Sequence, residues 1–110
     1  MVANRLTKAQ LNDCKKKLTA FKNTIYALNK NFIIQLSSDY ILIKDNDQQL
    51  VTIKINEHYL LAQKCKHFSQ LAIKTQHQLL SLIYQFIDQT KPYEIYNLIR
   101  ADEIMFDNEC

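Results

Sequence analysis

Glycine is missing from this chain: none of its 110 residues is Gly. Average usage would place roughly 8 glycines in a chain of this length. Because it has no Cβ, glycine lets the backbone approach a ligand closely and adopt positive φ at tight turns. The dinucleotide-binding fingerprint, the P-loop and the glycine-rich kinase loop all depend on it. The absence of glycine therefore excludes these nucleotide-binding classes.

Long apolar runs are absent too. No run approaches the roughly 18 residues that a membrane-spanning helix needs, and residues Met1–Arg5 lead into a polar segment that lacks the apolar centre of a secretory signal. We therefore expect a cytoplasmic protein that makes no contact with a membrane. The hydrophobic fraction of 47% predicts one globular domain over residues 1–110, in which residues 101–110 form an acidic C-terminal segment.

Cysteine is scarce and follows no paired pattern. The chain has three cysteines, Cys14, Cys65 and Cys110, and no two of them have CxxC spacing. An odd number without paired spacing argues against a disulfide framework. We expect two buried thiols and one thiol at the C-terminus.

Basic and acidic residues are unevenly distributed. Residues 1–30 hold seven Lys and Arg against one acidic residue, a net charge of +6, whereas residues 31–110 carry −3. The last ten residues contain four acidic side chains and no basic one. This asymmetry predicts an interaction surface, either for another molecule or between the two ends of the chain. We favour the hypothesis that residues 101–110 fold back on the basic N-terminal helix, because this would neutralise part of its charge.

The N-terminal part predicts a long amphipathic helix from Thr7 to Asn29. Thr7 and Gln10 have the spacing of a capping box. One apolar stripe follows at helical spacing, formed by Leu11, Cys14, Leu18, Phe21, Ile25 and Leu28. We expect the stripe to pack on the chain's own sheet, and a coiled-coil homodimer is the alternative.

A row of lysines accompanies the stripe. Lys8, Lys15 and Lys22 are seven residues apart, so they share one heptad position, and Lys16 and Lys17 add to the charge. These five lysines are the candidate partner-binding residues, because they suit an acidic protein surface or several nucleic-acid phosphates. The helix has no row of Arg or Asn suited to reading base edges. A solvated basic face, which needs no partner, is the other interpretation.

The middle of the chain predicts a three-stranded antiparallel meander. Asn31–Ser38, Tyr40–Lys44 and Leu50–Ile55 are short runs rich in β-branched and aromatic residues, separated by polar turn residues. Without glycine, Asn and Asp have to supply the left-handed turn conformations. We therefore expect the most strained turns at Ser38–Asp39 and Asn46–Asp47.

The segment after the meander is less regular. Asn56 can cap a short helix over Glu57–Lys64. Residues 65–74 predict either a loop or a fourth short strand at Ser69–Ile73.

Two further helices are expected beyond it. Thr75–Gln78 has the spacing of a second capping box and opens an amphipathic helix. After Pro92 a last helix is expected from Tyr93 to about Glu103. The predicted fold class is therefore α+β: a long N-terminal helix, a three-stranded meander, then two to three helices.

No combination of residues indicates catalysis or metal binding. His58, Cys65 and His67 lie near one another in the chain, but a zinc site takes four ligands, usually at paired spacings. No serine or cysteine lies in a nucleophile motif. We expect a protein that is not an enzyme and that uses neither a cofactor nor a metal.

The segment Gln78–Pro92 (QLLSLIYQFIDQTKP) resembles a pattern near the C-terminus of short phage and prophage proteins of low-GC Gram-positive bacteria. In those proteins a hairpin or meander precedes a helix that ends in LLxLIYEYA-x-TP. The resemblance covers about the second half of the chain, departs from the pattern at Asp88–Lys91 and does not include the basic first helix. It implies a small accessory protein of a mobile element, which acts by binding inside a host bacterium and for which no site residue can be carried over.

Together these features predict a non-enzymatic binding protein that inhibits or modulates a host protein or nucleoprotein complex by occlusion. An anti-CRISPR inhibitor that docks through the five lysines is its specific form. The net charge of +3 argues against an inhibitor that mimics nucleic acid. The alternative is a small nucleic-acid-binding regulator that uses the same basic helix.

Overall fold

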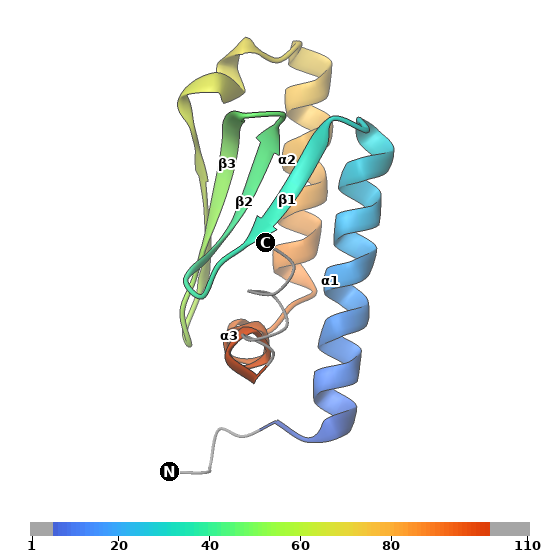
Figure 1. The fold of residues 1–110 in the computed structure, drawn as a ribbon, viewed down its shortest axis with the longest axis vertical. Coiled ribbons are helices and arrows are strands. Elements are labelled where there is room, and N and C mark those ends of the chain that lie inside the picture. The colour runs from blue at the N-terminus through green and yellow to red at the C-terminus, as the bar shows by residue number, and fades with distance from the viewer. Residues whose placement is uncertain (1–5, 102–110) are drawn as a thin grey trace.

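The computed structural model describes residues 6–101, and it has the predicted α+β fold class (Figure 1). A long helix comes first, four strands follow, and a 3-10 helix and two α-helices complete the order. The elements are α1 (Lys8–Leu28), β1 (Phe32–Leu36), β2 (Tyr40–Asp45), β3 (Gln48–Ile55), β4 (Leu60–Lys64), η2 (Lys66–Gln70), α2 (Ile73–Asp88) and α3 (Pro92–Ala101).

Helix α1 confirms the predicted first helix. The Thr7 hydroxyl accepts from the backbone N–H of Gln10 at 3.1 Å, and the Gln10 side chain accepts from the N–H of Thr7 at 2.8 Å. These two bonds complete the capping box and satisfy backbone donors at the start of the helix. The helix ends at Leu28, one residue before the predicted end, and Asn29 is its C-cap in an extended conformation.

The strands form one antiparallel sheet in the order β1-β2-β3-β4. The predicted meander is present, but it has four strands and not three. Between Ile43 and Lys44 the β2–β3 register slips by one residue, so that Ile43 faces Val51 while Lys44 faces Gln49. Leu50 is the extra residue of this bulge, and both Leu50 and Val51 are buried.

The fourth strand stands where a short helix was predicted, so that prediction is wrong. Asn56 does accept from two backbone donors, the N–H groups of His58 at 2.7 Å and Tyr59 at 3.0 Å, but it closes a turn rather than opening a helix. β4 then pairs with β3 along its whole length. An eight-residue helix is marginal in water, whereas pairing with β3 satisfies the backbone and buries Leu60.

The segment between β4 and α2 also differs from expectation. The strand predicted at Ser69–Ile73 does not form, since η2 occupies Lys66–Gln70. Helix α2 begins at Ile73, two residues before the predicted capping box, and Thr75 lies inside it. The Gln76 side chain donates to the carbonyl oxygen of Leu71 at 2.8 Å and so ties the first turn to the preceding loop.

The predicted last helix is present as α3, which begins at Pro92, one residue before the predicted start, and Ala101 is its last described residue. Its predicted end near Glu103 lies outside the described residues. Figure 1 shows α3 nearly end-on, beside the end of the sheet that carries the β1–β2 turn, while α1 and α2 run side by side along the long axis.

The three α-helices within residues 6–101 pack on one face of the sheet. The core joins the stripe of α1 to the inward residues of the strands and helices, and its fully buried members include Ile25, Ile43, Ile53, Leu79 and Leu98. The α1 stripe thus packs within the chain, as expected. We call the opposite side of the sheet the outer face; Ile33 and Leu61 on it are about half exposed, at 50% and 45%.

One of the two predicted turn strains is present. Among the described residues Asn46 alone has a positive φ without being glycine, at 56°. The strain predicted at Ser38–Asp39 is not found, since neither residue has a positive φ. The β1–β2 turn is closed by the N–H of Ser37, which donates to the carbonyl oxygen of Tyr40 at 2.9 Å. No helix within residues 6–101 combines the length and the apolar character that a membrane crossing requires.

Candidate functional site

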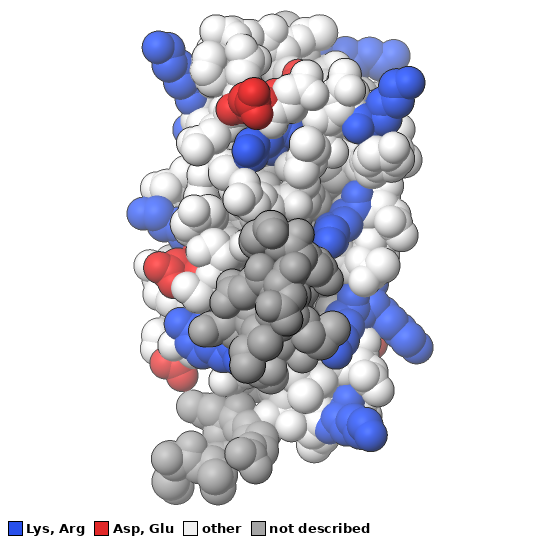
Figure 2. Space-filling view, viewed as in Figure 1, with Lys and Arg blue, Asp and Glu red and all other residues white. Residues whose placement is uncertain are grey.

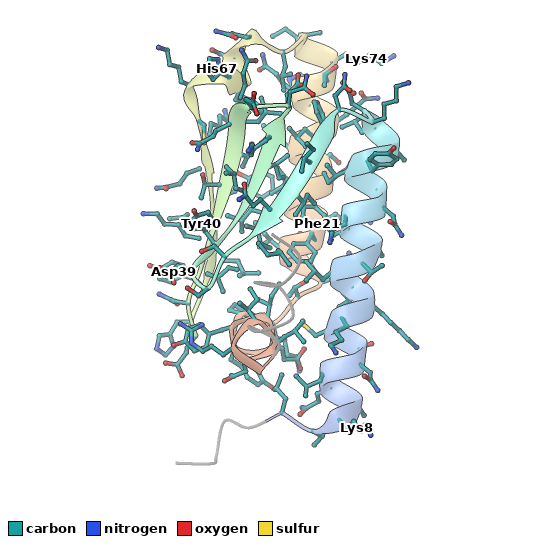
Figure 3. All side chains as sticks on the ribbon, viewed as in Figure 1. Lys8, Phe21, Asp39, Tyr40, His67 and Lys74 are labelled. Carbon is teal, nitrogen blue, oxygen red and sulfur yellow. The ribbon has the colours of Figure 1, made fainter. Side chains whose placement is uncertain are left out.

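The five candidate lysines lie on α1 but do not share one face. Lys8, Lys15 and Lys22 are separated by two turns each, which places them about 10 Å apart along the axis, with a drift of only about 20° per step. They form one row on a flank of the helix, which we call the lysine row. Figure 2 shows Lys and Arg side chains along the side of the molecule that α1 forms, and Lys8 is labelled at its lower end in Figure 3.

Lys16 and Lys17 point in other directions. Each residue of an α-helix turns about 100° from the last, so Lys17 is about 200° round from Lys15. Its ammonium group lies 3.3 Å from the carboxylate of Asp13, one turn earlier. Lys16 is exposed on the side of α1 away from the core. The structure therefore brings three of the five lysines together and separates the other two.

A groove runs between α1 and α2, on the other flank from the lysine row. It has a volume of about 510 Å³ and a mostly apolar lining, to which Thr24, Ala27 and Leu28 contribute from α1 and Ser81 and Leu82 from α2. Thr24 is two residues beyond Lys22 and so about 200° round the helix from it. A partner that docks on the lysine row would leave this groove open.

The thiols differ in their surroundings. Cys14 is buried as predicted, and burial raises its pKa from 9.0 to about 11, with the nearby carboxylate of Glu94 raising it further and Lys17 lowering it. Cys65 is only half-buried, which corrects the expectation of a second buried thiol, and its sulfur lies 3.4 Å from the hydroxyl of Thr52. Cys110 lies outside the described residues. A raised pKa keeps the Cys14 thiol neutral, the unreactive form.

Within residues 6–101 the histidines and acidic residues do not gather at one site. His58 lies in the β3–β4 turn, while His67 lies in η2 and has its Nδ1 atom 3.2 Å from the side-chain oxygen of Gln70. Within residues 6–101 no three His, Cys, Asp or Glu side chains come close enough to hold a metal ion.

Comparisons with family models, with curated proteins and with solved structures each found no match.

Two surfaces were not predicted from the sequence: the groove between α1 and α2, and the outer face of the sheet. The groove depends on how closely α1 and α2 approach each other, and this distance cannot be predicted from a local sequence pattern. The outer face could have been anticipated in part, because Lys44 and Lys54 alternate with core residues along β2 and β3.

Proposed function

We propose that this protein binds a host protein or nucleoprotein complex through the lysine row of α1 and acts by occluding it. The single observation behind the proposal is the alignment of Lys8, Lys15 and Lys22 on one flank, over about 21 Å of helix. A regular line of cations of that length suits an extended acidic surface, either carboxylates or phosphates.

The charges on α1 favour the attraction of an acidic partner along the whole lysine row. The only acidic residue within α1 is Asp13, which is paired with Lys17, on the side away from the row. The row thus presents cations without an interleaved carboxylate from its own helix. Lys16 and Lys17 contribute to the general positive potential, but their directions keep them from a flat surface that contacts the row.

The specific form that we propose is a phage or prophage inhibitor of a host defence complex, an anti-CRISPR protein. Support comes from the resemblance of Gln78–Pro92 to short phage proteins and from the basic helix. The test is phage plaquing on a low-GC Gram-positive host with an active CRISPR system that targets the phage. The wild-type chain should restore plaquing, and the double variant Lys8→Glu with Lys22→Glu should not.

A matched variant controls for total charge. Lys44→Glu with Lys54→Glu makes the same change in net charge on the outer face, away from the row. It should inhibit as the wild type does. Equal loss in both double variants, or no restoration by the wild type, would count against the proposal.

The second candidate function is a nucleic-acid-binding regulator, favoured by the same spacing of cations. If three lysines neutralise three phosphates, the logarithm of the binding constant for random duplex DNA should fall with the logarithm of salt concentration with a slope of about −3. Absence of binding at low salt would remove this candidate and leave a protein surface as the partner.

A further inference from the structure

The outer face of the sheet combines cations with apolar side chains. Its lysines are Lys44 on β2 and Lys54 on β3, and its apolar members are Ile33, Tyr40, Leu42 and Leu61. Alternation along the described strands places no acidic residue on this face. A face of this composition suits a ligand that is both acidic and apolar.

Leu42 lies near the middle of this face. It is only 6% exposed, although the helices pack on the other side of the sheet and Leu42 is not a member of the main core. Its cross-strand neighbours are Gln35 on β1 and Thr52 on β3. Leu42 thus lies between two polar neighbours, and the two lysines stand toward opposite ends of the face, since Lys44 pairs with Gln49 whereas Lys54 pairs with Tyr40.

The chain itself contains a segment of complementary composition. Residues 102–110, outside the described part, read DEIMFDNEC and carry a net charge of −4. Three apolar residues, Ile104, Met105 and Phe106, stand between two acidic groups. The order acidic–apolar–acidic matches a face that combines half-exposed apolar side chains with two separated lysines.

The described end of α3 brings this segment to the rim of the face. The guanidinium group of Arg100 donates to the carbonyl oxygen of Ser38 at 3.2 Å and packs over the ring of Tyr96 at 3.7 Å. Ser38 belongs to the β1–β2 turn, where the outer face begins. Nine extended residues span up to about 30 Å, which exceeds the roughly 14 Å across four paired strands.

We propose that residues 102–110 bind the outer face of the sheet within the same molecule. Ile104, Met105 and Phe106 cover Leu42 and Ile33, while the acidic side chains lie near Lys44 and Lys54. The segment thereby shields an apolar, basic face from other molecules. This proposal goes beyond the proposed function and does not depend on it, because it uses no residue of α1.

Fold-back onto α1 is the competing destination, and the full chain can distinguish the two. A nitroxide probe is attached to Cys110 of the Cys65→Ser variant; Cys14 is 1% exposed and stays unlabelled. Paramagnetic loss of backbone amide signals is then mapped by NMR. We expect the greatest loss at Leu42 and Thr52, and a smaller loss at Lys8 and Lys22.

Charge variants test the contact itself. Lys44→Glu with Lys54→Glu should abolish the signal loss on the sheet, and Lys8→Glu with Lys22→Glu, the matched change on α1, should leave it in place. Adding Asp102→Lys and Glu103→Lys to the sheet variant should restore the loss, since the charges are then exchanged and attract again.

Three results would overturn the proposal. The first is a signal loss centred on α1, and the second is a loss on the sheet that persists in the Lys44→Glu, Lys54→Glu variant. The third is an equal loss in an isotope-enriched, unlabelled chain mixed with a nitroxide-labelled chain, because the segment would then bind a second copy.

Discussion

Phe21 of α1 and Phe86 of α2 stack face to face, with ring centroids 4.2 Å apart and planes inclined by 15°. Both side chains are buried, at 5% and 1% exposed. The pair joins the two long helices at the level of the sheet, as the label of Phe21 in Figure 3 indicates. The stack fixes how α1 lies on α2, and with it the direction of the lysine row.

Truncation of this pair should destabilise the protein strongly. We expect Phe86→Ala to lower the free energy of unfolding by about 3–5 kcal/mol, because it removes a buried ring and leaves a cavity. Chemical denaturation measures the change. Tyr84→Ala, two residues away on α2 and 51% exposed, is the control and should cost much less.

The burial of Phe21 in the core also determines the effect expected of a polar substitution at this position. If the stripe formed a coiled-coil dimer, Phe21→Asp would dissociate it and leave a folded monomer. Because the ring lies in the chain's own core, we expect Phe21→Asp to unfold the chain. A folded monomer in light scattering and circular dichroism would contradict this packing.

Local patterns predicted more of this fold than long-range ones did. The stripe of α1 could be found because its 3–4 spacing is a property of one segment, and the turn at Asn46 because few residues tolerate positive φ. β4 could not be found in this way. By local preference Leu60–Lys64 can be helical or extended, and only its pairing with β3 makes it a strand. The candidate site was predicted as five lysines, but helix geometry separates Lys16 and Lys17 from the row.

The two predicted capping boxes offer a direct comparison. Thr7 caps α1 through its hydroxyl, whereas Thr75 lies inside α2 and caps nothing. We expect Thr7→Ala to cost about 0.5–2 kcal/mol of stability, the usual range for a lost N-cap. Thr75→Ala should cost little, because alanine favours a helix interior. Equal costs in thermal or urea unfolding would show that the box at Thr7 contributes nothing.

Asn46 is the position where a glycine would fit best. Its φ of 56° lies in the left-handed region, which costs most residues about 1–2 kcal/mol. Asn46→Val should therefore destabilise the chain by about that amount, while Asn46→Gly should change stability by less. Asp47→Val, in the same turn without positive φ, serves as the control. A smaller loss for Asn46→Val than for Asp47→Val would contradict the assignment of strain.

The buried thiol of Cys14 predicts how stability depends on alkaline pH. Its pKa rises from 9.0 to about 11 on folding, chiefly through burial and then through the carboxylate of Glu94. Below pH 9 the thiol is neutral in both states, so its contribution is constant. Between the two values the unfolded chain releases the proton and the folded chain holds it, so stability falls as pH rises, by about 2–3 kcal/mol in all.

A difference between two variants isolates this contribution from that of every other ionisable group in the chain. Urea unfolding of the wild type and of Cys14→Ala should be compared from about pH 8 to about pH 10.5. The wild type should lose more stability over that range than the variant does. Glu94→Gln, which removes a charge that raises the pKa of Cys14, should make the fall shallower. A constant difference between wild type and Cys14→Ala at all pH values would mean that folding does not perturb this thiol.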